Sequence, residues 1–189
     1  MKIAVLALQG AFIEHINMLH SLGAKTIEIR KKSDLDNDFD GLVIPGGEST
    51  VIGKLLRELD LLEDIQLKIK SGLPVFGTCA GLILLAKNIE NQDMMYLQTL
   101  DVTIKRNAFG RQCNSFQIKH FFDDKRIDMV LIRAPYICAT KENVTILSEY
   151  QGKILAVRQE NQLGVAFHPE LTKDDTVHKY FLDMINENS

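Results

Sequence analysis

The chain has 189 residues and a formal net charge of −3 at pH 7, with 46% hydrophobic and 25% charged residues. These values are typical of one globular domain that can bury a core without disulfides or a structural metal. We therefore expect a single domain over residues 1–189. The mild charge forms no basic stripe, which argues against nucleic acid or a membrane surface as a partner.

The apolar runs are far shorter than the ~18 residues that a membrane span requires. Met1-Lys2 leads directly into a strand pattern, so we expect no secretory segment. The three cysteines, Cys79, Cys113 and Cys138, are widely spaced, which makes a disulfide framework or a zinc site improbable. Together these features predict a cytoplasmic protein with reduced thiols that needs no metal or organic cofactor.

Apolar strand patterns alternate with helical ones in the first half of the chain. Strands are expected over Ile3–Leu8, 26–29, 41–44 and 74–77, and helices over 12–22, in two segments of 55–69, and over 80–87. This alternation predicts an α/β fold of three layers with a mostly parallel central sheet, similar to flavodoxin.

The second half is richer in strands, joined by short turns. Strands are expected over 102–105, 129–133, 145–148, 154–158 and 164–167. We expect them to extend the main sheet, in part antiparallel. A final helix over 174–186 carries an apolar face, and we expect His178 on its solvated side.

The motif Gly77-x-Cys79-x-Gly81 lies between an apolar strand and an apolar helix. This is the arrangement of a nucleophile elbow, in which a sharp turn lifts the reactive side chain above the sheet edge. The N-terminus of the following helix favours a thiolate, and the Ala80 amide could donate to an oxyanion. A lone cysteine is usually a buried structural residue, but the strand before it and the helix after it favour a nucleophile.

A thiolate nucleophile needs a histidine and a group that orients it. Of the five histidines, His168 ends an apolar strand and is followed by Pro169 and Glu170. Residues two apart in an extended segment point the same way, so Glu170 could reach the His168 ring. Alone, this segment could equally be a surface turn. Beside the elbow, it predicts the base and its orienting carboxylate.

The loop Pro45-Gly46-Gly47 ends the third expected strand at the same sheet edge, where open α/β sheets bind ligands. Its Gly47 amide could complete an oxyanion hole with Ala80. Glu48 and Ser49 would then lie at the mouth of the site, near a substrate amino or carboxylate group. The alternative is a turn followed by a helix cap, and the two interpretations are compatible.

These motifs resemble those of the class I, or triad, glutamine amidotransferase family. The closer similarity is to the glutaminase subunits of pyridoxal 5'-phosphate synthase. It covers residues 8 to 171 and rests on Leu8-Gln-Gly-Ala11, Glu14-His15, Pro45-Gly-Gly-Glu-Ser-Thr50, Gly77-Thr-Cys-Ala-Gly-Leu82, Arg106-Asn-x-Phe-Gly-Arg-Gln112, Ile132-Arg-Ala-Pro135 and Phe167-His-Pro-Glu-Leu171.

The resemblance implies that the chain hydrolyses L-glutamine to glutamate and ammonia. The ammonia would pass to a pyridoxal 5'-phosphate synthase subunit, which builds the vitamin B6 ring. Cys79 would be the nucleophile, His168 the base and Glu170 its orienter. The glutamine-binding positions implied are Gly47, Glu48, Ser49, Arg106, Ile132 and Arg133. For the two arginines, a structural ion pair is the alternative to binding of the substrate carboxylate.

The resemblance also implies that docking to the synthase activates a glutaminase that is poorly active alone. The Gly46-Gly47 peptide is a plausible switch, because glycine tolerates a peptide flip at small cost. The first helix, including His15, and the Gln9-Gly10 turn are candidates for the docking face.

Three rival functions stay open at this point. The chain could be another triad amidotransferase, feeding histidine, purine or anthranilate synthesis, although 106–112 and 132–135 argue against this. It could be a cysteine hydrolase or peptidase that needs no partner. It could also be a non-catalytic module that retains the fold, which the complete triad makes improbable.

Overall fold

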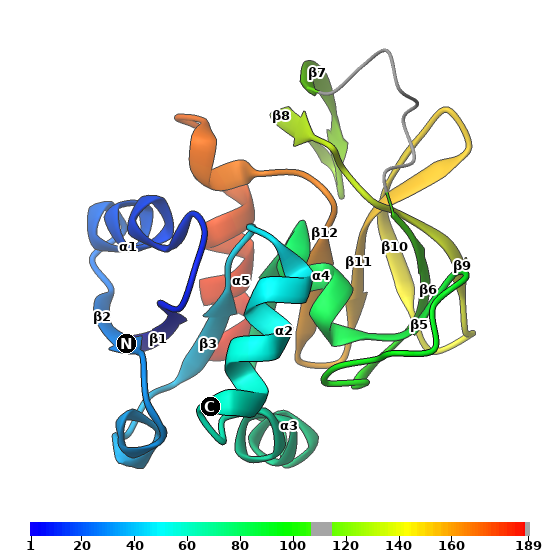
Figure 1. Ribbon diagram of the computed structural model, residues 1–189. Coiled ribbons are helices and arrows are strands. Elements are labelled where there is room, and N and C mark those ends of the chain that lie inside the picture. Colours follow the sequence, from blue (N-terminus) through cyan, green and yellow to red (C-terminus); the bar gives the residue numbers. More distant parts are fainter. Residues whose placement is uncertain (107–114, 188–189) are drawn as a thin grey trace.

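The computed structural model describes residues 1–106 and 115–187 (Figure 1). Its strands are β1 (Lys2–Leu6), β2 (Lys25–Ile29), β3 (Gly41–Ile44), β4 (Val75–Thr78), β5 (Ala86–Ile89), β6 (Leu100–Lys105), β7 (Ser115–Phe122), β8 (Lys125–Ile132), β9 (Tyr136–Thr140), β10 (Thr145–Tyr150), β11 (Lys153–Gln159) and β12 (Gln162–Val165). Its α-helices are α1 (Phe12–Ser21), α2 (Ser49–Glu58), α3 (Leu62–Lys70), α4 (Ala80–Leu85) and α5 (Thr176–Asn186), with 3-10 helices η1 (Lys32–Asp36) and η2 (Pro169–Leu171).

The described strands form one large sheet and a separate hairpin. The sheet has ten strands in the order β2-β1-β3-β4-β12-β11-β9-β6-β5, with β10 paired to β11. The first five strands in this order are parallel to their neighbours. Counting β12 as the fifth strand, their arrangement is the flavodoxin-like order 2-1-3-4-5. The expected α/β fold with a parallel core is therefore confirmed.

Helices cover both faces of this parallel half. In Figure 1, α2 and α4 lie in front of the sheet and α5 lies behind it. The ring of Phe76 in β4 contacts His15 of α1, and also His178 and Phe181 of α5, so α1 and α5 share a face. Phe76 and Phe181 are fully buried. The three layers expected from the alternating pattern are thus present, and they meet at β4.

The second half of the chain departs from the sequence prediction in detail. β5, β7 and β9 were not expected, and α4 ends at Leu85 because Ala86 already pairs with Leu100 of β6. β11 is antiparallel to β12, β10 and β9, which confirms the expected extension of the main sheet. β7 and β8 form a two-stranded hairpin of their own. An apolar run alone cannot show where a helix gives way to a paired strand.

Asp101 in β6 joins four segments of this antiparallel half. Its carboxylate accepts hydrogen bonds from Lys87 (2.6 Å), Asn143 (3.0 Å) and Gln159 (3.1 Å). The hydrogen bond from Lys87, followed by that from Asn143, lowers the pKa of Asp101 to about 2.

Asp101→Asn should therefore lower the free energy of unfolding at pH 7 by about 1–3 kcal/mol, since the Lys87, Asn143 and Gln159 donors would then face a neutral amide group. A carboxylate with a lowered pKa stabilises the fold above the pKa of the unfolded chain, and this contribution is lost as the pH falls toward 2. Urea unfolding at pH 7 and at pH 3 should show a smaller difference at pH 3. Asp124→Asn, at an exposed turn, is the matched control and should change little.

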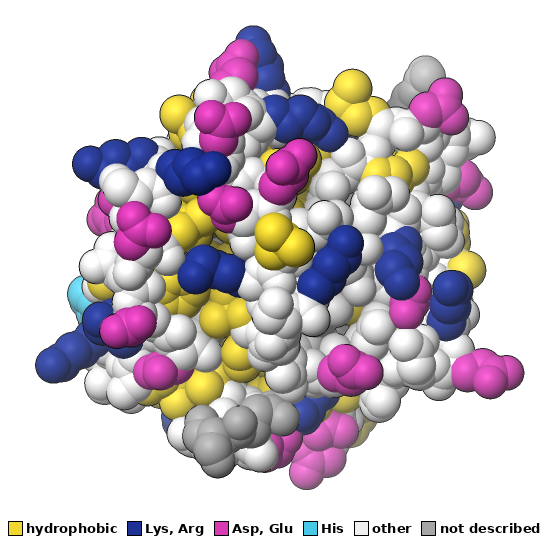
Figure 2. Space-filling view, turned by 90° about the horizontal axis from the view of Figure 1, so that it is seen from below, with side chains coloured by type: hydrophobic (Ala, Val, Ile, Leu, Met, Phe, Trp, Pro, Cys, Tyr) yellow, Lys and Arg dark blue, Asp and Glu magenta, His cyan; other side chains and the backbone are white. Residues whose placement is uncertain are grey.

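Charged side chains of both signs are interspersed with apolar ones on the face shown in Figure 2. Among the described residues, no helix is long and apolar enough to span a bilayer.

Candidate active site

Cys79 lies at the sharp turn between β4 and α4. Its backbone has φ 48° and ψ −98°, a region that residues with a Cβ rarely adopt. The Cys79 N–H donates to the carbonyl of Val165 in β12, at 2.8 Å, which anchors the turn to the neighbouring strand. A Cβ on Gly81 would overlap the carbonyl oxygen of Ile44. The turn can therefore form only where glycine follows the cysteine at this spacing, as expected of a nucleophile elbow.

His168 reaches the same sheet edge from β12. This strand runs parallel to β4, with Val165 opposite Thr78. The His168 N–H donates to the carbonyl of Val130 in β8, at 2.8 Å. These contacts place the imidazole beside the Cys79 side chain, with which it forms a hydrogen bond.

The Glu170 carboxylate holds the other side of the imidazole. His168 Nδ1 lies 2.7 Å from Glu170 Oε1, and both side chains are buried. Burial alone lowers the pKa of His168, but the hydrogen bonds with Cys79 and Glu170 outweigh it and raise that pKa to about 10. His168 is therefore a cation at neutral pH. The spacing from His168 to Glu170, predicted from the sequence, brings the two groups into direct contact.

The Gly46-Gly47 loop lies against the reactive pair. A Cβ on Gly46 would come within 2.9 Å of His168 Nδ1 and 3.4 Å of Cys79 Cβ. The Gly46 carbonyl accepts a hydrogen bond of 3.0 Å from the Ala11 N–H at the start of α1. This hydrogen bond defines one orientation of the Gly46-Gly47 peptide. A flip of that peptide to a second orientation stays a prediction.

Two backbone amides are expected at the oxyanion position, that of Ala80, which follows Cys79, and that of Gly47, which follows Gly46. The Ala80 N–H is in the first turn of α4, where no intrahelical acceptor exists. Gly47 is exposed, and the next amide, that of Glu48, donates to the side chain of Gln9 at 2.8 Å.

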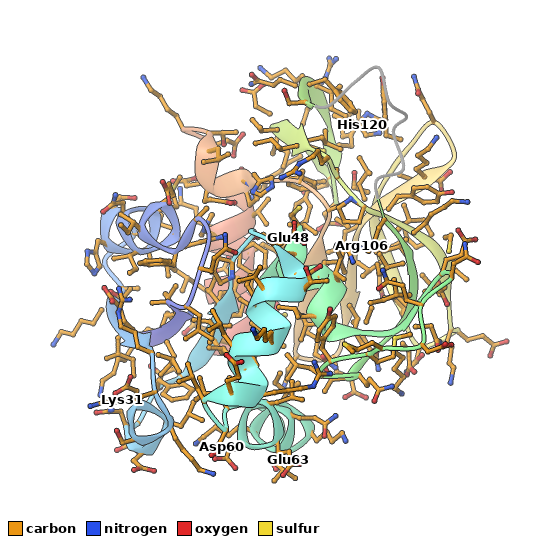
Figure 3. All side chains as sticks on the ribbon, viewed as in Figure 1. Lys31, Glu48, Asp60, Glu63, Arg106 and His120 are labelled. Carbon is orange, nitrogen blue, oxygen red and sulfur yellow. The ribbon has the colours of Figure 1, made fainter. Side chains whose placement is uncertain are left out.

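Glu48 and Arg106 lie on the same side of the molecule and face each other (Figure 3). Arg106 Nη2 lies 3.3 Å from Glu48 Oε1. The ion pair that was the alternative for Arg106 is thus present. Ser49 is buried, and its hydroxyl has no hydrogen-bond partner in the described part of the chain.

Ile132 is the last residue of β8, the strand whose Val130 carbonyl accepts the hydrogen bond from the His168 backbone, and Arg133 follows it. Arg133 is exposed and has a φ of 42°. Within residues 1–106 and 115–187, no hydrogen bond or ion pair occupies its guanidinium. The remainder of the 106–112 motif and Cys113 lie outside the described residues.

His15 and His178 contradict the sequence prediction. Both side chains are fully buried, so His178 is not on a solvated face and His15 cannot belong to a docking face. The sequence did carry a signal for the burial of these histidines, because His15 is three residues after Phe12 and His178 is three residues before Phe181. Each histidine therefore shares the apolar face of its helix.

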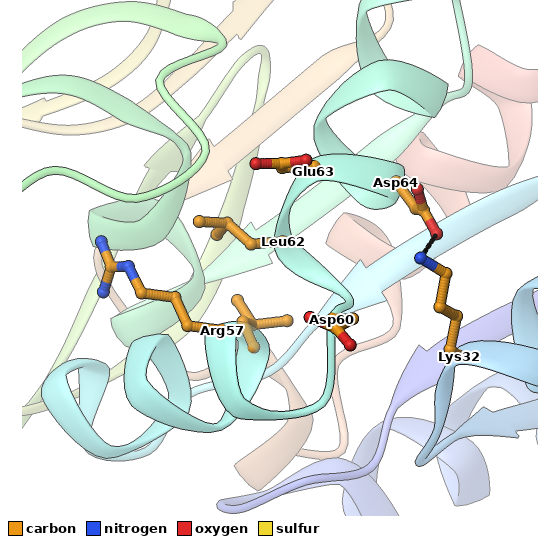
Figure 4. A pocket seen from close by; sticks show the side chains of 7 residues that line it. Lys32, Arg57, Asp60, Leu62, Glu63 and Asp64 are labelled. Carbon is orange, nitrogen blue, oxygen red and sulfur yellow. Dashed lines mark ion pairs between the residues drawn. The ribbon is translucent and has the colours of Figure 1, made fainter.

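A cavity of about 290 Å³ lies away from this site, between the end of α2 and the start of α3 (Figure 4). It is lined mainly by charged side chains, including the Lys32–Asp64 ion pair at 3.2 Å. Glu48 is at the opposite end of α2, so this cavity is separate from the reactive cysteine.

The fold, and the elbow cysteine beside a paired histidine and carboxylate, match the arrangement expected of a glutamine amidotransferase of the triad class. A profile of the SNO glutamine amidotransferase family matches residues 5–187. The chain belongs to this family, which confirms the expected fold class and the expected class of enzyme.

Individual relatives agree with this assignment. The pyridoxal 5'-phosphate synthase subunit PdxT of Methanocorpusculum labreanum is 55% identical over 186 residues, which cover 98% of each chain. Its counterpart from Desulfitobacterium hafniense strain Y51 is 50% identical and covers 99% of this chain and 94% of that one. A crystal structure of a glutamine amidotransferase matches with a TM-score of 0.92 at 41% identity, covering 97% of this chain and 98% of that one.

Proposed function

We propose that the chain, as one domain over residues 1–189, is the glutaminase subunit of a cytoplasmic pyridoxal 5'-phosphate synthase. It hydrolyses L-glutamine and delivers the ammonia to the synthase subunit. The observation that carries the proposal is the contact of His168 with both Cys79 and Glu170 at the carboxyl ends of two neighbouring parallel strands. The names and close similarity of the PdxT relatives support the choice of synthase.

The reaction begins at Cys79. The protonated imidazole of His168 lies beside the sulfur, and the thiolate is the nucleophilic form of a cysteine. The thiolate attacks the side-chain amide carbon of glutamine, and the Ala80 and Gly47 amides receive the oxyanion. His168 then gives its proton to the departing ammonia. It next takes a proton from the water that hydrolyses the γ-glutamyl thioester.

The same sheet edge offers groups for the two charged ends of the substrate. Arg133 has an unoccupied guanidinium among the described residues and suits the α-carboxylate. Glu48 suits the α-ammonium group, and its ion pair with Arg106 holds it at the start of α2. Ser49 brings a buried hydroxyl without a partner in the described ranges, and Gly47 and Ile132 complete the binding positions.

The docking face for the synthase includes the outer side of α1 and the Gln9-Gly10 turn. Ile13 in α1 and Leu171 in η2 are large apolar side chains that stay exposed, at 56% and 43%. The Gln9 side chain accepts a hydrogen bond from the Glu48 amide, and the Ala11 amide donates to the Gly46 carbonyl. This surface is therefore bonded directly to the Gly46-Gly47 loop. A partner bound here could reorient the Gly46-Gly47 peptide.

A covalent label tests both the nucleophile and the substrate. A glutamine analogue with a diazoketone in place of the amide should alkylate Cys79 and spare the exposed Cys138, as peptide mass spectrometry would show. Free L-glutamine should protect Cys79. Labelling that glutamine does not suppress would contradict the substrate assignment.

The same preparation tests the choice of synthase. Glutamate release should rise on addition of the pyridoxal 5'-phosphate synthase subunit. Hydrolysis that the subunit does not change would retain the glutaminase and reject this partner.

A further inference from the structure

A row of buried polar side chains continues from Glu170 into α1 and α5. His15 Nε2 lies 3.1 Å from Thr78 Oγ1 and 3.5 Å from Glu170 Oε2. His15 Nδ1 lies 2.9 Å from His178 Nε2. Both histidines are fully buried, and the Phe76 ring packs edge-on against each of them. The mechanism described above uses none of these contacts.

Two atoms in this row are buried and have no hydrogen-bond partner among the described residues: Glu170 Oε2 and His178 Nδ1. The first is a carboxylate oxygen, which needs a donor facing it when it is removed from water. The second is a ring nitrogen, which is a donor or an acceptor according to the tautomer. The surroundings of these two atoms determine which ring nitrogen of His15 and of His178 carries the proton.

His15 is neutral, because burial and the nearby His178 and His168 rings hold its pKa well below the usual value. It therefore has one N–H. If His15 Nδ1 carried that proton, His178 would have to accept it at Nε2 and place its own N–H on Nδ1, where the described residues offer no acceptor. A lone pair on His15 Nε2 would then also face the carboxylate of Glu170.

The other tautomer resolves both conflicts. His178 donates from Nε2 to His15 Nδ1, and its Nδ1 becomes an unprotonated acceptor, which is less costly to bury unpaired than an N–H group. The His15 Nε2–H then donates to Thr78 Oγ1, and Glu170 Oε2, 3.5 Å from the same nitrogen, faces an N–H group and not a lone pair. No set of three metal-ligating side chains converges within the described ranges, so this row is a hydrogen-bonded chain and not a metal site.

We propose that His15, with its tautomer fixed by His178, is a positioning residue of the triad. It holds the Glu170 carboxylate in the orientation in which Glu170 contacts the His168 ring. The His15 ring also contacts Thr78, the residue before Cys79, so it links the elbow to the orienting carboxylate. This inference rests on the proposed glutaminase function.

The test compares His15→Gln with His15→Leu in glutamate release, with the synthase subunit present. Gln keeps an N–H donor near the position of the imidazole Nε2, whereas Leu removes it and keeps the bulk. The Leu variant should lose about tenfold to a hundredfold in kcat with an unchanged KM for glutamine, as expected when a polar group that supports a catalytic residue is removed. The Gln variant should recover most of kcat. Equal losses in both variants, or none in the Leu variant, would overturn the proposal.

Three further measurements keep the test decisive. Imidazole nitrogen NMR of the unsubstituted protein should find the protons of His15 and His178 on Nε2, and a proton on His15 Nδ1 would refute the inference even if the Leu variant failed to fold. His178→Phe preserves the packing on Phe76 but removes the donor, and it should lower kcat in the same direction. Cys79→Ala separates failure of this inference from failure of the proposed function, because glutamine hydrolysis by that variant would reject the proposed function itself.

Discussion

Cys79→Gly should abolish glutamine hydrolysis and yet give a more stable fold than Cys79→Ala does. Both changes remove the sulfur, and no other side chain can form the thioester. They differ in the backbone, because φ 48° and ψ −98° strain any residue with a Cβ but suit glycine. Relief of strain in such a region amounts to about 1–3 kcal/mol, against less than 1 kcal/mol for the extra freedom of glycine in the unfolded chain.

We therefore expect the Gly variant to exceed the Ala variant by about 1 kcal/mol in the free energy of unfolding. Denaturant titrations of the two variants, with glutamate release measured in parallel, make the comparison. Cys138→Ala, at an exposed cysteine, is the control and should retain activity. An Ala variant as stable as the Gly variant would show that the elbow stores no strain.

Glu170→Gln should lower kcat by about a thousandfold or more, as expected when the carboxylate that orients a catalytic histidine is replaced by an amide. The amide can turn an N–H group toward His168 Nδ1, which selects the tautomer that carries its proton on the side of Cys79. Burial lowers the pKa of His168, and the contacts with Cys79 and Glu170 raise it to about 10. Without the carboxylate this pKa falls, so the alkaline limb of the kcat profile should move to lower pH.

The stability of the same variant gives an independent readout. A histidine whose pKa is raised in the folded state stabilises it fully below the unfolded pKa of about 6.5, and this contribution is lost as the pH rises through about 10. The stability difference between Glu170→Gln and the unsubstituted protein should thus be largest below pH 6 and shrink toward pH 10. Glu160→Gln, at an exposed turn, supplies the control. A difference that grew with pH would contradict the assigned charge of His168.

The sequence indicated which candidate side chains the fold brings together, because each lies in a short motif that depends on local geometry. Gly-x-Cys-x-Gly requires a tight turn, and the His-Pro-Glu segment places a carboxylate beside its own histidine. The parallel half of the sheet was likewise predictable from continuous apolar strands.

What the sequence did not reveal depends on contacts between distant segments. The pairing of Ala86–Ile89 with β6, and the burial of His15 and His178 against Phe76, are of this kind. The start of β7 alternates polar and apolar residues from Ser115 to Lys119, so a strand signal was present in the sequence there.

The parallel register of β4 and β12 has a consequence for how the chain can vary in length. Cys79 and His168 are far apart in the sequence, but the spacing between them is set by two adjacent strands. The intervening chain leaves and returns through the antiparallel half, and its exposed turns, such as Gln151-Gly152, can absorb insertions at little cost. One residue added within β12 would instead reverse the faces of the strand and turn His168 away from the sulfur. Relatives of unequal length can therefore share one chemistry, provided that their added residues avoid these two strands.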